Sequence, residues 1–189
     1  MNELKKELQN EGACFETTSD TEVILEGYML HGVDYIKKLN GIFAIAIWDG
    51  NEECLYLFRD RLGVKPFFYT MAGETLVFSS EIKGLFEYPQ IKPVLDREGL
   101  CEIFALGPAK TYGKGVFKNV MEVLPGQFIR FAKHTSEQKP YWELVSKPHE
   151  DSYEETVEKT SWLLEDSVKK QMLSDIPIST FLSGGVDSS

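Results

Sequence analysis

The sequence is poor in cysteine and has no long apolar run, and both deficits exclude classes of protein. Its three cysteines, Cys14, Cys54 and Cys101, lie far apart and outside any C-x-x-C spacing, so neither a disulfide framework nor a zinc site is predicted. No apolar stretch approaches the roughly 20 residues that span a bilayer, and no apolar signal core follows Met1. We therefore expect a cytoplasmic protein without a membrane partner, in which Cys54 and Cys101 are buried thiols.

Basic residues are also in deficit. The chain has 20 Lys and Arg against 30 Asp and Glu, a formal net charge of -10. Because the basic residues are scattered, they form no electrostatic footprint for a phosphate backbone, and nucleic acid is not expected as a partner. Hydrophobic residues make up 42% of the 189 residues, which suffices for one ordinary core and part of a second domain.

The periodicity of apolar residues predicts a mixed α and β domain first. Ser19-x-x-Glu22 has the spacing of a capping box at a helix start. The run 41–49 is apolar at odd and even positions, which predicts a strand covered on both faces. The predicted helices cover residues 2–11, 19–30, 81–86 and 96–106, and the predicted strands cover 41–49, 54–58, 67–70, 76–79, 120–124 and 127–131. In the helix at 96–106, Leu100, Ile103 and Phe104 are expected to face inward.

Composition changes after Trp142, where residues 143–152 read as a polar linker. Ser152-x-x-Glu155 again has capping-box spacing and precedes a long amphipathic helix, which Pro177 ends. Residues 178–182 then read as a strand. The sequence therefore predicts two domains, 1–145 and 146–189.

The segment after this strand carries the strongest functional signal, Ser183-Gly184-Gly185-Val186-Asp187-Ser188-Ser189. Glycines after a strand let successive backbone N–H groups approach a phosphate closely. The serine hydroxyls add donors, and a carboxylate such as Asp187 can hold Mg²⁺ against a pyrophosphate. The pattern lacks the lysine of a Walker loop. It resembles the SGGxDS loop of the ATP-pyrophosphatase family, whose members adenylate a carboxylate and release pyrophosphate.

Four further segments occur in order: S-D-T-E-V-I at 19–24, L-N-G-I-F-A at 39–44, R-D-R-L-G-V-K-P at 59–66 and F-S-S-E-I-K at 78–83. Together they resemble the class II glutamine amidotransferase domain. With the loop at 183–189, their order resembles the glutamine-hydrolysing asparagine synthetases over essentially the whole chain. The resemblance implies an α+β, N-terminal-nucleophile-hydrolase-type αββα sandwich, incomplete at its N-terminus. The first elements of an α/β adenine-nucleotide α-hydrolase-like domain follow.

The resemblance also implies roles for single residues. Asp20 corresponds to the aspartate that binds the α-amino group of glutamine, although a plain helix cap also accounts for it. ATP is expected to contact Leu182, Ser183, Gly184, Gly185, Asp187, Ser188 and Ser189, and for Leu182 a buried strand position is an equal reading. Arg59 and Asp60 carry charges that can pair, and we expect them to support the fold rather than to react.

The implied substrates are glutamine, aspartate and ATP, with Mg²⁺ as cofactor, and the family also allows a homodimer.

One feature of the sequence departs from the family's pattern. Class II amidotransferases use an N-terminal cysteine, whose thiolate attacks the amide while its α-amine serves as base. This sequence opens Met1-Asn2, and Cys14 has no free α-amine, so the chain alone is expected to lack glutaminase activity. A related amide ligase and a non-catalytic interaction or regulatory remnant are the alternatives.

Overall fold

The structure is a computed structural model that describes residues 2–107, 109–133, 135–172, 174, 176–180 and 183–185. It divides into two compact units, 1–144 and 145–189. None of the helices formed by the described residues combines the length and apolar character needed to cross a membrane.

The first unit contains six helical segments and seven strands among its described residues. The helices are α1 (Asn2–Asn10), α2 (Asp20–His31), the 3-10 helix η1 (Gly32–Lys38), α3 (Ile82–Leu85), α4 (Arg97–Cys101) and the π-helical segment η2 (Glu102–Leu106). The strands are β1 (Ala44–Asp49), β2 (Cys54–Arg59), β3 (Phe68–Ala72), β4 (Thr75–Ser79), β5 (Met121–Glu122), β6 (Gln127–Ala132) and β7 (Thr135–Pro140). The elements predicted from apolar periodicity are thus present, with small shifts of their ends, whereas β7 was not predicted.

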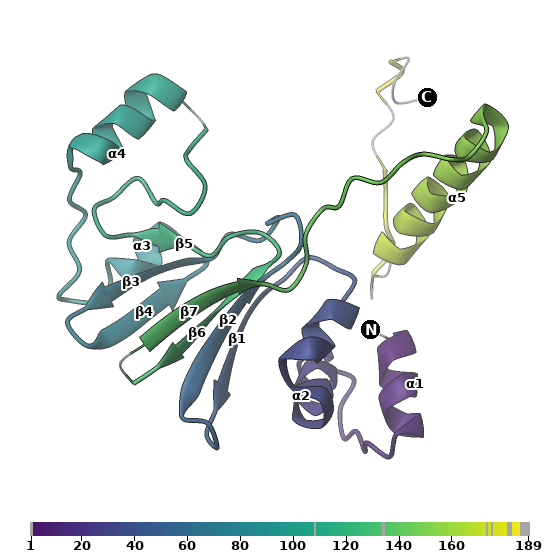
Figure 1. Cartoon of the computed structure of the whole chain (residues 1–189), viewed down its shortest axis with the longest axis horizontal. Coiled ribbons are helices and arrows are strands. Elements are labelled where there is room, and N and C mark those ends of the chain that lie inside the picture. Colours follow the sequence, from purple (N-terminus) through teal and green to yellow (C-terminus); the bar gives the residue numbers. More distant parts are fainter. Residues whose placement is uncertain are drawn as a thin grey trace. The chain divides into compact units, whose positions relative to one another are not determined.

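The strands form two antiparallel sheets that pack face to face (Figure 1). The larger has the order β1-β2-β6-β7 and the smaller the order β4-β3-β5. Leu57 and Ile129 of the larger sheet pack with Phe67 and Val123 of the other layer, and all four are buried. Alternate residues of each strand point to opposite faces, so the remaining face of each sheet needs its own cover.

Helices provide that cover on both sides. On the larger sheet, Leu8 of α1, Val23 of α2 and Ile36 of η1 pack with Tyr56 and Phe58 of β2 in one buried cluster. On the smaller sheet, Leu85 of the short helix α3 is completely buried with Phe68 and Val120. The layers therefore follow the order helix, sheet, sheet, helix, which is the predicted sandwich.

Two local predictions about this unit were wrong. Glu22 does not complete a capping box with Ser19, because its carboxylate accepts hydrogen bonds from Glu16 and Thr17 instead. β1 is not covered on both faces either: Ala46 and Trp48 are exposed, and Trp48 keeps 64% of its surface. The apolar run does form the strand β1, but the second sheet covers only part of the face that carries Ala46 and Trp48.

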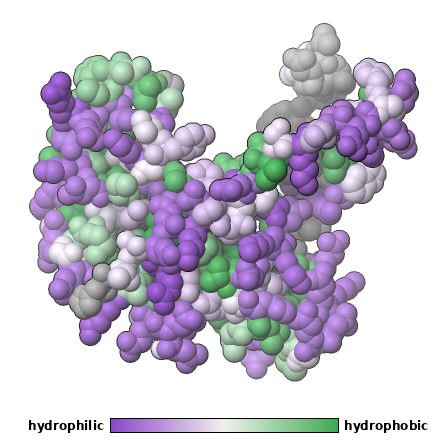
Figure 2. Space-filling model, in the orientation of Figure 1, coloured by the Kyte–Doolittle hydropathy of each residue, from purple (hydrophilic) through white to green (hydrophobic). Residues whose placement is uncertain are grey.

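The predicted inward face of the helix at 96–106 is also exposed. Leu100, Ile103 and Phe104 retain 43%, 40% and 84% of their surface, and Cys101, predicted as buried, is exposed while Cys54 is buried. Figure 2 shows the apolar side chains gathered over α4 at the upper left. The amphipathic stripe is real, but within this unit α4 and η2 extend away from the sheets instead of packing on them (Figure 1).

Among the described residues of the second unit, one segment is helical: α5 (Tyr153–Gln171), as predicted. Ser152 and Glu155 form a complete capping box at its start. No residue of α5 is buried. The predicted strand at 178–182 was wrong for residues 178–180, which adopt no regular secondary structure. A strand requires a neighbour to satisfy its backbone N–H and C=O groups, and no described segment pairs with these residues. Leu182 lies outside the described residues.

Candidate functional site

The carboxylate of Asp20 is presented at the first residue of α2. Ser19 precedes it as the helix cap, and its hydroxyl accepts a hydrogen bond from Thr21 N–H at 3.2 Å. Ser19 is therefore the N-cap of α2, so capping does not account for Asp20. Asp20 is exposed, and within the described part of the chain no hydrogen bond or ion pair reaches its carboxylate. A carboxylate at a helix N-terminus interacts favourably with the helix dipole.

The segment before Asp20 is braced by Glu22. The Glu22 carboxylate accepts hydrogen bonds from Glu16 N–H at 2.7 Å, from Thr17 N–H at 2.8 Å and from the Thr17 hydroxyl at 2.5 Å. Lys5 of α1 donates to the Thr17 carbonyl at 2.6 Å. The bond from the Thr17 hydroxyl, followed by that from Glu16, lowers the pKa of Glu22. The approach to Asp20 is thus tied both to its own helix and to α1.

The position of α2 on the sheet is fixed by close packing and by one polar contact. Gly27 lies directly against the ring of Tyr35, where an added Cβ would meet ring carbon Cε1 at 2.0 Å, so only glycine allows η1 to pack this closely. The Tyr28 hydroxyl donates to Asp49 Oδ2 at 2.8 Å, which anchors α2 to the end of β1. Burial, followed by the bond to Asp49, raises the pKa of Tyr28. Asp20 therefore projects from a rigidly seated helix.

Arg59, at the end of β2, is buried and supports the fold as predicted, but not through Asp60. Its guanidinium donates to the carbonyls of Lys65 at 2.8 Å, Gly63 at 2.7 Å and Val123 at 2.8 Å. Its charge is balanced by Glu122, with Nη1 and Oε1 separated by 2.8 Å. One side chain thereby joins β2, the following turn and β5.

Asp60 organises the turn that follows. Its Oδ1 accepts from Leu62 N–H at 3.2 Å and Val64 N–H at 3.0 Å, and its Oδ2 accepts from Lys65 N–H at 2.9 Å. Gly63 adopts a left-handed φ of 67° inside this turn, as only glycine does readily. Within the R-D-x-x-G-x-K-P segment, Asp60 therefore fixes the backbone of the turn at residues 62–65.

Glu122 is the residue of this network that the sequence did not reveal. It is only 5% exposed and bridges Arg59 to Lys110, whose Nζ lies 2.8 Å from the same Oε1 atom. Lys110 also lies over the ring of Phe68, 4.5 Å from its centroid. A single glutamate between Met121 and Val123 was the available signal, since charged residues are rarely buried without a partner.

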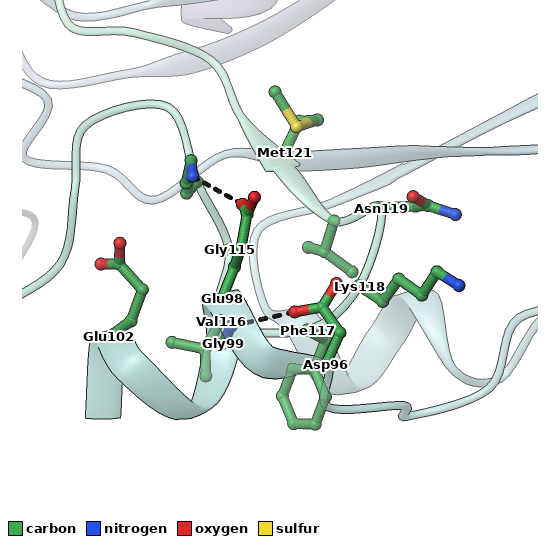
Figure 3. A pocket seen from close by; sticks show the side chains of 12 residues that line it. Asp96, Glu98, Gly99, Glu102, Gly115, Val116, Phe117, Lys118, Asn119 and Met121 are labelled. Atoms are coloured by element: carbon green, nitrogen blue, oxygen red, sulfur yellow. Dashed lines mark hydrogen bonds and ion pairs between the residues drawn. The ribbon is translucent and has the colours of Figure 1, made fainter. Parts of the chain in front are cut away.

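A cavity of about 300 Å³ lies between α4 and the segment that precedes β5 (Figure 3). Its acidic side chains are already engaged: Asp96 accepts from Gly99 N–H at 2.9 Å, Glu98 pairs with Lys114 at 2.7 Å, and Glu102 accepts from Thr111. None of the four amidotransferase-like segments lines this cavity. It is therefore separate from the candidate glutamine site.

Of the predicted ATP-binding loop, the structure describes only Ser183, Gly184 and Gly185. Gly184 has a left-handed φ of 74°, and the Ser183 hydroxyl accepts from Gly185 N–H at 3.4 Å. This local turn is compatible with a phosphate-binding loop. Asp187, Ser188 and Ser189 lie outside the described residues. Among those described, no group of three or more His, Cys, Asp or Glu side chains forms a metal-binding cluster.

The sequence patterns of two protein families match the chain. The glutamine amidotransferase domain matches residues 1–142, and asparagine synthase matches residues 159–189. The first match covers the whole sandwich and includes Asp20, and the second includes most of α5 and the SGGVDSS segment.

Several curated proteins are similar over nearly all of the chain. Asparagine synthetase [glutamine-hydrolyzing] 3 of Bacillus subtilis is 48% identical over 99% of this chain and 30% of its own length. Putative asparagine synthetase [glutamine-hydrolyzing] 2 of Methanocaldococcus jannaschii is 40% identical, with 92% and 34% covered. Amidase chyE of Penicillium rubens is 35% identical, with 93% and 26% covered. The chain thus spans about a third or less of the length of these relatives.

The fold also resembles that of a solved enzyme. Glutamine phosphoribosylpyrophosphate amidotransferase from B. subtilis matches with a TM-score of 0.51 and 23% identity, over 76% of this chain and 27% of that one. At this identity the likeness concerns the fold alone, and it confirms the fold type predicted for the first unit.

Proposed function

Because the chain belongs to the family of glutamine amidotransferase domains, we propose that it is part of a glutamine-dependent asparagine synthetase. The observation that carries this proposal is the succession of an amidotransferase match at 1–142 and an asparagine synthase match at 159–189 in one chain. In the proposed reaction, ATP adenylates the side-chain carboxylate of aspartate and pyrophosphate leaves. Ammonia released from glutamine then displaces AMP, which yields asparagine and glutamate.

Asp20 is proposed to bind the α-ammonium group of glutamine. Its carboxylate is exposed, lies at a helix N-terminus and has no partner among the described residues. Charge-assisted hydrogen bonds of about 2.7–2.9 Å to an ammonium group are roughly twice as strong as neutral ones. The bracing of the preceding segment by Glu22 and Lys5 supports this role, because a fixed carboxylate loses less conformational entropy on binding.

The loop at 183–189 is proposed to bind ATP, with Leu182 beside the nucleotide and Asp187 as a ligand of Mg²⁺. The turn at Gly184 supports a backbone cradle for phosphate oxygens. When bound, the metal would neutralise charge on the pyrophosphate group. We place the boundary between the two domains after residue 145. The protein is proposed to reside in the cytoplasm and to form a homodimer.

A second candidate is an amide ligase of the same architecture that acts on another acceptor. The similarity to Amidase chyE, which is 35% identical over 93% of the chain, supports this second candidate. The acceptor determines which candidate holds, because both would consume ATP and glutamine.

The test measures product formation by the protein in which this chain occurs. Purified protein is supplied with ATP, Mg²⁺, glutamine and aspartate, and asparagine, glutamate and AMP are quantified. The proposal expects the three products in equal amounts, and expects no AMP when aspartate is omitted. Glutamate and AMP formed only with a different carboxylic acid would establish the second candidate. Binding of neither ATP nor glutamine would indicate a non-catalytic interaction protein and reject both.

A further inference from the structure

Asparagine or aspartate precedes glycine at only two places in the sequence, Asn40–Gly41 and Asp49–Gly50. Both pairs carry the same latent chemistry, because the backbone nitrogen of the glycine can attack the side-chain carbonyl carbon of the residue before it and close a cyclic imide. Glycine favours this approach since it has no side chain to restrict the backbone. The structure gives the two pairs opposite surroundings.

Asn40 and Gly41 lie in the open link between η1 and β1. Both residues are exposed and belong to no helix or strand. Among the described residues, no hydrogen bond engages either the Asn40 side chain or the Gly41 N–H. A Cβ placed on Gly41 would meet nothing within 4 Å, so no neighbour restricts the backbone there. The attacking nitrogen and the amide carbon are therefore free to meet.

Asp49 is held in place by three hydrogen bonds. Its Oδ1 accepts from Asn51 N–H at 2.9 Å and from Glu52 N–H at 3.0 Å, and its Oδ2 accepts from the Tyr28 hydroxyl at 2.8 Å. The bond from Glu52, followed by that from Tyr28, lowers the pKa of Asp49. An ionised carboxylate fixed in this way is a poor electrophile and cannot turn toward the Gly50 nitrogen.

We propose that Asn40 is a site of spontaneous deamidation, and that the native fold protects Asp49–Gly50 from the corresponding isomerisation. In the first step, the Gly41 nitrogen loses its proton and bonds to Cγ of Asn40. The bond from Cγ to Nδ2 breaks, and ammonia leaves. Water then adds to one of the two imide carbonyls, which gives aspartate or isoaspartate and needs no other reactant.

The site lies between two fixed points of the fold. Leu39 is buried, with 3% of its surface exposed, and the carbonyl of Phe43 accepts a hydrogen bond from Asp60 N–H at 3.0 Å. An isoaspartate at position 40 would route the main chain through the side-chain methylene group and lengthen this link. The reaction also adds a negative charge to a chain whose formal net charge is already -10.

The test incubates the native chain at mildly alkaline pH and maps its peptides by mass spectrometry, with isoaspartate detected by enzymatic carboxyl methylation. A parallel sample is unfolded in urea. The matched variant is Gly41→Ala, which the structure accommodates because nothing crowds the added Cβ and Gly41 has no positive φ. We expect acid products at Asn40 in the native chain, formed at least about tenfold more slowly in Gly41→Ala, a difference of about 1.4 kcal/mol in activation free energy.

The Asp49–Gly50 peptide is the internal control. We expect it to stay unchanged in the native chain and to acquire isoaspartate only in urea. An intact Asn40 in the native chain would overturn the proposal, as would equal rates in the parent chain and Gly41→Ala. Isomerisation of Asp49 at the same rate with and without urea would overturn the protective part.

Discussion

The Glu122 carboxylate holds the Arg59 guanidinium at 2.8 Å in the core, where the two side chains are only 4% and 7% exposed. The sequence places them far apart, on β5 and β2. The Arg59 guanidinium also donates hydrogen bonds to the carbonyls of Lys65, Gly63 and Val123. The R-D-x-x-G-x-K-P segment is therefore one part of a clamp whose other part is a single glutamate.

Replacing Glu122 by glutamine is expected to lower the free energy of unfolding by about 3 kcal/mol, because it leaves the buried Arg59 charge uncompensated. Urea denaturation measures this change. The matched control is Glu137→Gln, which removes the carboxylate of the exposed Glu137–Lys139 pair on β7 and is expected to cost less than about 1 kcal/mol. Equal small losses in both variants would mean that the buried pair does not support the fold.

Two buried tyrosines are expected to respond in opposite ways to removal of their hydroxyl groups. The Tyr35 hydroxyl is buried without a hydrogen-bond partner in the described part of the chain, whereas the Tyr141 hydroxyl donates to the Arg59 carbonyl at 2.7 Å. Tyr35→Phe should therefore raise the free energy of unfolding by about 1 kcal/mol, and Tyr141→Phe should lower it by about 1 kcal/mol. Thermal and urea unfolding of both variants measure the signs, and a loss in Tyr35→Phe would show that its hydroxyl is satisfied.

The segment before Asp20 is expected to loosen in acid. The hydrogen bond from the Thr17 hydroxyl, followed by that from Glu16, lowers the pKa of Glu22 below its ordinary value of 4.5. Because the folded-state pKa is the lower one, the ionised carboxylate stabilises the segment above pH 4.5, and this contribution is lost as the pH falls through the lowered pKa. Hydrogen-exchange protection of the Glu16 and Thr17 amides should follow that course.

Two variants show whether Glu22 causes this change. Glu22→Gln should weaken the protection of these amides at neutral pH and remove most of its dependence on acid. Glu26→Gln, on the same helix and without a hydrogen bond to the segment, should behave like the parent chain. Unchanged protection in Glu22→Gln would show that another contact holds the segment.

Most of the sandwich was predictable because its strands are apolar where they are buried. β2 and β6 were placed almost to the residue, because most of their residues are apolar and none is exposed. β7 was missed because all six residues of T-S-E-Q-K-P are exposed. It is a strand only because its backbone pairs with β6 along its whole length, and that pairing leaves no pattern in the side chains.

The other errors have other causes. An apolar stripe on the helix at 96–106 predicted a buried face, yet Phe104 is 84% exposed, because periodicity reveals an amphipathic helix but not what covers it. Residues 178–182 were interpreted as a strand, but no described segment pairs with the described residues 178–180. Glu122 was missed because one glutamate in a strand carries no information about a distant arginine. Asp20 was placed correctly at the start of α2, and its role stays a prediction.

The measurement that tests the central claim most directly compares glutamine with ammonium as the nitrogen source in the Asp20→Asn variant of the protein in which this chain occurs. The claim assigns Asp20 to the glutamine ammonium group, an interaction of about 2–3 kcal/mol for a hydrogen bond to a charged group. We expect kcat/KM for glutamine to fall about 30- to 150-fold, while ammonium-dependent asparagine formation and the control Asp34→Asn stay unchanged. An unaltered kcat/KM for glutamine in Asp20→Asn would contradict the account.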